Sequence, residues 1–213
     1  MLSQAVLFDF DFTLCDSSAA HLDSVRTALE EVGAPIPSDD AILATTASFA
    51  EAFERFAPHH PTADLVRRAE ARLDTSFLPL ARLYEPVPAV VTELHARGYR
   101  LGIISMKRAH RIDALLTHAG LRAAFGIIVG GDSVVQRKPH PEGIELVMRS
   151  LGATPATTIY VGDNLIDFHT AQAANVPFIA VLTGATTRAE FHAHSIAHIL
   201  EDVASLPFVL RQD

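Results

Sequence analysis

Cysteine is almost absent from this sequence, and so are long hydrophobic runs. The single cysteine, Cys15, cannot form a disulfide within the chain, which favours a reducing compartment. No segment reaches the roughly 18 uninterrupted apolar residues of a membrane span. The first residues lack the basic and apolar regions of a signal peptide. We therefore expect a cytoplasmic protein that has no membrane partner.

Positive charge is also scarce. Asp and Glu number 25 against 17 Lys and Arg, which gives a formal net charge of −8. The basic residues are scattered along the chain, which excludes the clustered basic surface of a nucleic-acid-binding protein, so we expect no nucleic-acid partner. Only two of the basic residues are lysines, Lys107 and Lys138.

Residues 17–86 have helical periodicity and contain no convincing strand. The first helix ends near Gly33, because glycine commonly terminates helices. The second helix begins after an N-cap at Ser38, Asp39 or Asp40. The last helix begins at Thr62. We predict that residues 17–86 form an all-helical domain inserted after the first strand, "VLF" at residues 6–8.

Strands and helices alternate through the rest of the chain. The expected strands are "VLF" near the start and residues 99–105, 125–130, 157–163 and 176–183, with a short last strand in "AHILED". The expected helices are residues 88–97, 108–119, 141–151 and 165–174. Near-continuous apolar strands that alternate with helices indicate an α/β fold, a Rossmann-like parallel sheet with helices on both faces. We predict that residues 1–16 and 87–213 form this core domain.

Polar residues gather where these strands end, and ligands bind open parallel sheets beyond the carboxyl ends of the strands. Lys138 lies in the loop "RKPHPEG", just before a helix. Asp167 follows Asp163 by four residues, so both carboxylates can face one site if a helix starts near residue 165. The side chains at this edge are Asp9, Asp11, Ser105, Lys138, Asp163 and Asp167.

Several carboxylates without histidine or cysteine suit a hard divalent cation, most naturally Mg²⁺. Such an ion would compensate the charge of carboxylates placed at the end of a buried strand. A cation and one lysine together provide positive charge for a phosphoryl group. An aspartate can then attack phosphorus, and a second carboxyl can act as acid and base.

The motifs "DFDFTLCDS", "IISMK", "KPHP" and "GDNLID" occur in this order at the strand ends. Together they resemble the haloacid dehalogenase superfamily, and more narrowly its phosphoglycolate phosphatase and β-phosphoglucomutase branch, which has a helical cap. The resemblance covers essentially the whole chain. It implies a phosphatase with a Rossmann-like core, in which the cap closes over the site to select the substrate.

The resemblance also implies catalytic roles. Asp9 would be the nucleophile and form an aspartyl-phosphate, and Asp11 would be the general acid and base. Lys138 would balance the charge of Asp9 and of the phosphoryl group. Because the dehalogenases proper lack an aspartate at the position of Asp11, its presence argues for phosphate chemistry.

The resemblance further implies two sets of ligands. The phosphate-binding set is Ser105, Met106, Lys138 and Thr13. The Mg²⁺ ligand set is Asp9, Asp11 (through its backbone carbonyl), Asp163 and Asp167, the last directly or through water.

Two positions depart from the family pattern. Many relatives have glycine where this sequence has Phe12, and we expect this bulky side chain to pack under the cap or narrow the entrance. Many have asparagine where this sequence has Met106, which removes one polar contact near the phosphate. The change at Met106 leaves the exact substrate and the full efficiency of the reaction open.

Simpler structural explanations exist for some residues. Asp16 is expected to cap the first helix of the inserted domain rather than bind a ligand. His192, His194 and His198 look like a metal-binding tract, but His198 falls in a different element, so we expect no zinc site.

We therefore expect a Mg²⁺-dependent phosphatase that hydrolyses a small phosphorylated metabolite resembling phosphoglycolate. The alternatives are a phosphosugar mutase of the β-phosphoglucomutase type and a catalytically silent binding or regulatory relative. The protein is expected to be a monomer or a homodimer, with a small phosphorylated metabolite as its partner.

Overall fold

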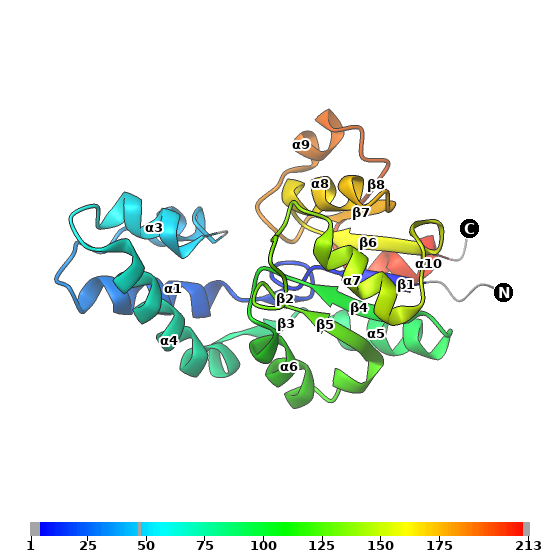
Figure 1. The fold of residues 1–213 in the computed structure, drawn as a ribbon, viewed down its shortest axis with the longest axis horizontal. Helices are drawn as coiled ribbons and strands as arrows, with labels where there is room; N and C mark the ends of the chain where they lie inside the picture. The colour runs from blue at the N-terminus through cyan, green and yellow to red at the C-terminus, as the bar shows by residue number, and fades with distance from the viewer. Residues whose placement is uncertain (1–4, 47, 211–213) are drawn as a thin grey trace. The chain divides into compact units, whose positions relative to one another are not determined.

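The computed structural model describes residues 5–46 and 48–210. The chain divides into two compact units, one formed by Met1–Cys15 and Leu83–Asp213 and the other by Asp16–Arg82. Figure 1 shows the elements of both. Within the described ranges, every helix is too short or too polar to cross a membrane.

The first unit contains a six-stranded parallel sheet with the strand order β5-β4-β1-β6-β7-β8. Its strands are β1 (Ala5–Phe8), β4 (Arg100–Ile104), β5 (Phe125–Val129), β6 (Thr158–Gly162), β7 (Phe178–Val181) and β8 (His198–Leu200). The prediction of an α/β fold with a parallel sheet is confirmed. Most predicted strands are one to several residues too long at their ends, where the pairing of the sheet stops before the sequence pattern does.

Helices cover both faces of this sheet, and Figure 1 shows α7 and α8 on the face opposite α5 and α6. All four residues of β1 are buried, as expected for a strand covered on both sides. Leu7 and Tyr160 share one apolar core with residues of α7, α8 and α9. The helices of this unit are α5 (Val87–Ala96), α6 (Ala109–His118), α7 (Glu142–Leu151), α8 (Leu165–Ala173), α9 (Arg188–Ala193) and α10 (Leu206–Val209), with short 3₁₀ turns at Arg122–Ala124, Pro155–Thr157 and Val203–Ser205.

The order of the strands reverses at β1. The chain continues from β1 to β4 and β5 on one side, and then to β6, β7 and β8 on the other. The connections that leave neighbouring strands run in opposite directions at such a switch point, which leaves a crevice there for a ligand. Asp9, which directly follows β1, therefore lies where this fold class places its binding sites.

The second unit is helical, with α1 (Ser18–Glu30), α2 (Asp39–Leu43), α3 (Phe49–Phe56) and α4 (Thr62–Leu80). The side chains of Ser38 and Ser48 accept hydrogen bonds from the first turns of α2 and α3. Arg72 of α4 donates two hydrogen bonds to Asp23 of α1, at 2.6 and 2.8 Å. These contacts and a shared apolar cluster hold the helices together.

One short strand departs from the prediction for residues 17–86. Arg82–Leu83 forms β3, which pairs with β2 (Cys15–Asp16) in a two-stranded sheet. Two residues are too few to give a periodic signal, so the sequence pattern could not reveal this strand.

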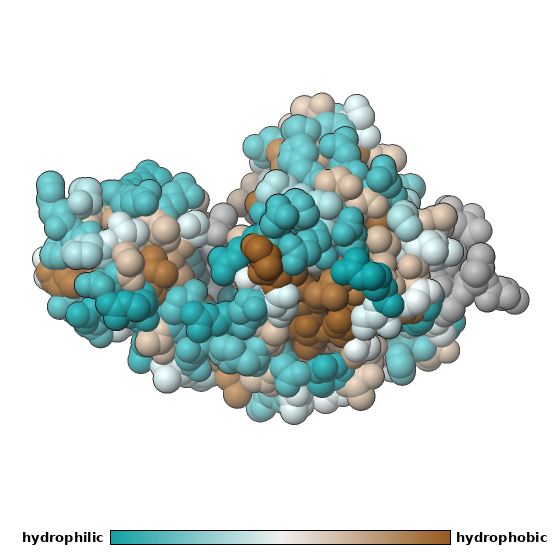
Figure 2. Space-filling view, viewed as in Figure 1, coloured by the Kyte–Doolittle hydropathy of each residue, from teal (hydrophilic) through white to brown (hydrophobic). Residues whose placement is uncertain are grey.

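Most of the face seen in Figure 2 is hydrophilic or neutral, and the largest group of hydrophobic residues on it lies over β5 and α7. β5 is an edge strand, and Ile127 on it is only partly buried. Leu146 and Leu151 of α7 are partly buried in the same way.

Candidate active site

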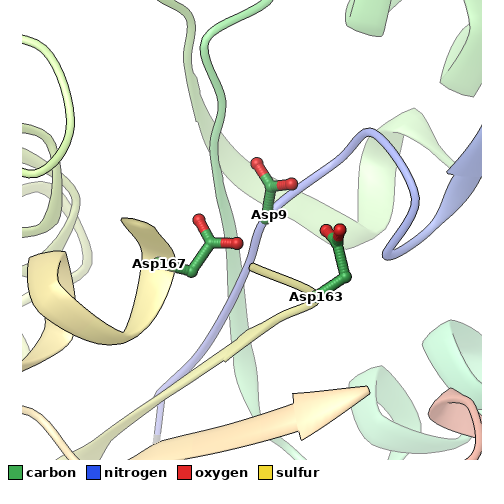
Figure 3. Close-up of side chains that lie close together, drawn as sticks. All are labelled: Asp9, Asp163 and Asp167. Atoms are coloured by element: carbon green, nitrogen blue, oxygen red, sulfur yellow. The ribbon is translucent and has the colours of Figure 1, made fainter. Parts of the chain in front are cut away.

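Three carboxylates converge at the carboxyl edge of the sheet (Figure 3). Asp9 follows β1, Asp163 follows β6, and Asp167 lies in the first turn of α8. Each offers a carboxylate oxygen within 4.8 Å of the others. Asp9, Asp163 and Asp167 are 7%, 4% and 1% exposed, so this acidic cluster is buried.

Lys138 joins two of these carboxylates. Its Nζ donates to Oδ1 of Asp9 at 2.6 Å and to Oδ1 of Asp167 at 2.7 Å. When all groups are ionised, three carboxylates and one ammonium leave two negative charges uncompensated. Because buried charge is costly without compensation, the cluster favours a bound divalent cation. An all-oxygen set of this kind fits a hard cation.

The local structure aims each of these carboxylates. The Asp9 N–H donates to the Val161 carbonyl at 2.8 Å, so Asp9 continues the line of β1. Thr13 donates its hydroxyl to Oδ1 of Asp163 at 3.0 Å. Asp167 forms a capping box with Asn164, whose N–H donates to Oδ2 of Asp167 at 3.2 Å.

Burial perturbs the protonation of this cluster. Burial raises the pKa of Asp9 from 3.8 to about 7, although the Lys138 ammonium acts in the opposite direction. Burial and then the charge of Asp9 raise the pKa of Asp163 to about 9. For Lys138, burial favours the neutral amine, but Asp167 and Asp9 outweigh it and raise the lysine pKa above its ordinary value. The cluster therefore holds protons more tightly than the same groups in water.

Asp11 faces the other lysine of the chain. Lys107 Nζ lies 3.2 Å from Oδ1 of Asp11, and the Lys107 side chain is only 9% exposed. The sequence drew attention to Lys107 by its rarity, but no role was predicted for it. Both lysines of the chain thus pair with aspartates of the "DFDFT" segment.

The predicted phosphate-binding residues divide into two groups. Ser105, Met106 and Lys138 line one small pocket. Ser105 is 4% exposed, and its Oγ accepts a hydrogen bond from the Lys107 N–H at 3.2 Å. Thr13 instead supports Asp163, as described above. Ser105 does not cap α6, because Arg108 occupies the N-cap position of that helix.

Tyr160 is a site residue that the sequence analysis missed. It belongs to β6, is fully buried, and donates its hydroxyl to Oδ1 of Asp167 at 3.0 Å. The available signal was a phenol within the apolar run "TIYVG", because a buried hydroxyl requires a hydrogen-bond partner.

Asp16 and the three histidines near the end of the chain lie outside the acidic cluster. Asp16 accepts hydrogen bonds from the N–H and hydroxyl of Ser18, the first residue of α1, but the N-cap position that was expected for Asp16 belongs to Ser17. In the part of the chain that the structure describes, the acidic cluster is the one group of three side chains suited to a metal. His192, His194 and His198 form no such group there.

Phe12, the bulky residue in the loop after β1, has a positive φ of 59°. Its carbonyl accepts a hydrogen bond from the Thr183 hydroxyl. Glycine adopts this backbone conformation freely and other residues rarely do, so the loop keeps a turn suited to glycine despite the larger side chain.

The family model described as "Haloacid dehalogenase-like hydrolase" matches residues 6–181. A phosphoglycolate phosphatase of Yersinia pseudotuberculosis is 30% identical over 189 residues, which cover 85% of this chain and 82% of that protein. A phosphoglycolate phosphatase of Xanthomonas campestris is 30% identical over 192 residues, which cover 85% and 84% of the two chains.

Solved structures agree with this similarity. A crystal structure of a candidate haloacid dehalogenase-like hydrolase from Bacteroides fragilis matches with a TM-score of 0.88 and 33% identity, over 96% of this chain and 99% of that one. CbbY from Rhodobacter sphaeroides, solved in complex with phosphate, matches with a TM-score of 0.80 and 25% identity, over 96% of each chain.

Proposed function

The chain belongs to the haloacid dehalogenase-like hydrolase family, and on this premise we propose that it is a Mg²⁺-dependent phosphatase of a small phosphorylated metabolite. The observation that carries the proposal is the position of Lys138 between Asp9 and Asp167, with Asp163 close by. This arrangement combines a nucleophile, positive charge for phosphoryl oxygens and oxygen ligands for a cation.

In the first step an oxygen of Asp9 attacks phosphorus. Lys138 holds Oδ1 of Asp9, so we assign the attack to Oδ2. An O–P bond forms to Asp9 as the bond from phosphorus to the leaving oxygen breaks. Asp11, two residues further on, gives a proton to that oxygen, so the leaving group departs as an alcohol.

In the second step water attacks the phosphorus of the aspartyl-phosphate. Asp11 takes a proton from this water, the bond between Asp9 and phosphorus breaks, and inorganic phosphate leaves. Lys138 faces the carboxylate that is released and stabilises its returning charge. Because Asp11 pairs with Lys107 before substrate is present, its role as an acid requires this pair to separate when substrate binds.

Mg²⁺ fits the acidic cluster, and when bound it adds positive charge that neutralises phosphoryl oxygens. We assign it to Asp9, Asp163 and the backbone carbonyl of Asp11, with Asp167 acting directly or through water. The two uncompensated negative charges of the cluster match the charge of the ion.

For the substrate we propose phosphoglycolate or a closely similar metabolite. The support is that curated relatives at 30% identity carry the name phosphoglycolate phosphatase. All the proposed catalytic side chains belong to the first unit, the core unit that contains the parallel sheet. We therefore assign substrate selection to the helical domain, residues 17–86.

The test is phosphate release from a panel that includes phosphoglycolate, sugar phosphates, pyrophosphate and a generic aryl phosphate. The reaction is run with Mg²⁺ and with a chelator. Asp9→Asn should reduce release at least about a thousandfold, because it removes the nucleophile. Asp113→Asn is the matched control, since Asp113 pairs with Arg122 outside the acidic cluster. Persistent activity in Asp9→Asn would reject the mechanism, and no release from any compound would favour a mutase or a silent binding protein.

A further inference from the structure

Tyr160 makes contacts that extend beyond packing. Its hydroxyl lies 3.0 Å from Oδ1 of Asp167 and 3.3 Å from the carbonyl of Ile104, the residue before Ser105. Its ring lies beneath Lys138, with the ammonium nitrogen 5.4 Å from the ring centroid. One side chain of β6 thus touches α8, the end of β4 and the buried lysine.

The sheet explains how one residue reaches these groups. Tyr160 lies beside Leu7 in the register of β6 and β1. Side chains two residues apart in a strand share a face, so Asp9 continues on the face of Leu7 and Tyr160. The phenol ring therefore lies under the acidic cluster, and its hydroxyl reaches across β1 to the carbonyl of Ile104.

We propose that Tyr160 is a positioning residue, whose hydroxyl fixes the Asp167 carboxylate and thereby holds Lys138 against Asp9. The inference rests on the proposed function, because it assigns Lys138 the task of orienting the Asp9 nucleophile. Tyr160 contacts Asp167 and Lys138, and it acts on the Asp9 nucleophile through them.

The hydrogen bonds of Asp167 explain the need for this hydroxyl. Oδ2 accepts from the Asn164 N–H, while Oδ1 accepts from both Lys138 and Tyr160. With the hydroxyl removed, Oδ1 would keep only Lys138 and Oδ2 only the Asn164 N–H, so the carboxylate would gain freedom to turn about its side-chain bond. Lys138 would then lose the fixed partner that aims it at Asp9.

A phenol suits this position because it donates a hydrogen bond without adding charge. Burial, with the charges of Asp167 and Asp9, raises the Tyr160 pKa well above its ordinary value, so the hydroxyl remains a donor. The ring also makes a cation–π contact with the Lys138 ammonium. An aliphatic side chain could not make this contact. Phenylalanine would keep the ring and its packing and lose only the hydroxyl.

The experiment compares Tyr160→Phe with Tyr99→Phe. Tyr99 also donates its hydroxyl within the core unit, to the Leu210 carbonyl at 3.0 Å, so the control loses an equivalent hydrogen bond. We expect Tyr160→Phe to lower kcat with an aryl phosphate about 10-fold to 100-fold, with KM changed less than about threefold. Tyr99→Phe should keep both constants.

A second readout follows Lys138 directly. Because the chain has only two lysines, metal-free protein labelled with ¹⁵N-lysine gives only two side-chain ammonium signals, which Lys107→Arg assigns. Tyr160→Phe should shift the Lys138 signal and speed its hydrogen exchange at least about 10-fold, while the Lys107 signal stays in place. Tyr99→Phe should alter neither signal.

The two readouts separate this inference from the proposed function. An unchanged Lys138 signal or an unchanged kcat in Tyr160→Phe overturns the positioning role, even if wild-type protein is an active phosphatase. Equal changes in Tyr99→Phe overturn it too, because they would reflect a general loss of stability. If the wild-type protein releases no phosphate, the proposed function fails while the Lys138 signals still test the contact.

Discussion

Asp163 and Gly184 approach each other so closely that any side chain at position 184 would displace this carboxylate. A Cβ built on Gly184 would lie 1.9 Å from Oδ2 of Asp163, and one built on Gly162 would lie 2.6 Å from Oδ2 of Asp167. Both distances are far below van der Waals contact. These two glycines therefore create the space in which two of the three carboxylates lie.

Gly184→Ala should displace the Asp163 carboxylate and weaken Mg²⁺ binding at least about 10-fold, because fixed ligand geometry determines the affinity of such sites. Isothermal titration with Mg²⁺ measures the effect. The matched control is Gly120→Ala, where the added Cβ meets nothing within 4 Å but φ is +71°. That control should lose about 1 kcal/mol of stability, because alanine is strained at this positive φ, and retain its Mg²⁺ affinity. Equal Mg²⁺ affinities in Gly184→Ala and wild type would show that Asp163 does not hold the ion.

At the scale of single elements, the loop that delivers Lys138 is held by the helix that follows it. Glu142, in the first turn of α7, accepts hydrogen bonds from the N–H groups of Val135 and Gln136 at 3.0 and 2.8 Å. These two bonds lower the Glu142 pKa. Arg137, the residue before Lys138, donates to the Gly131 carbonyl at 2.9 Å. These hydrogen bonds hold the three residues that precede Lys138 and thus limit the freedom of the loop.

Glu142→Ala should release this loop and raise amide hydrogen exchange at Val135 and Gln136 at least about 10-fold. Exchange measured by NMR at neutral pH gives the result residue by residue. Glu145→Ala is the matched control, since Glu145 lies in the same first turn but its ion-pair partner is Arg149, at 3.9 Å. If both variants exchange alike, the loss of an acidic residue from the helix start explains the effect, and the hydrogen bonds to the loop do not.

At the scale of the whole molecule, the acidic cluster makes the stability of the metal-free protein depend on pH. The pKa values of Asp9 and Asp163 are raised from 3.8 to about 7 and about 9. The folded protein therefore binds protons that the unfolded chain has released. Such groups stabilise the fold at low pH, and this stabilisation disappears as the pH rises through their folded pKa values.

The free energy of unfolding of the metal-free protein should accordingly fall between pH 5 and pH 8.5, by about 1 kcal/mol or more. The lowered carboxyl pKa values of Asp23, Glu142 and Glu190 affect only more acidic solutions. Mg²⁺ should raise Tm more at pH 8 than at pH 6, because it binds the ionised carboxylates. Urea denaturation and thermal melts with and without Mg²⁺ measure both effects. A metal-free stability that rises over this range would contradict the raised pKa values, and a smaller slope in Asp9→Asn would confirm their source.

The sequence by itself determined the α/β class, the alternation of the six sheet strands with the helices α5 to α8, and the edge of the sheet at which the polar residues lie. These features are local, because apolar runs and helix caps depend on neighbouring residues. The motifs by themselves also placed Asp9, Lys138, Asp163 and Asp167 at that edge. Their roles in catalysis stay predictions.

The tertiary structure alone decided which groups touch. Lys138 and Asp9 are separated by 129 residues along the chain, and Thr13 and Asp163 by 150. The sequence pattern did not indicate that Lys107 faces Asp11, that Tyr160 lies beneath Lys138, or that Gly184 leaves space for Asp163. The physical reason is that pairing distances depend on strand register and on the packing of helices against the sheet. Both are set by the whole chain, whereas the residues that could pair are visible in short segments.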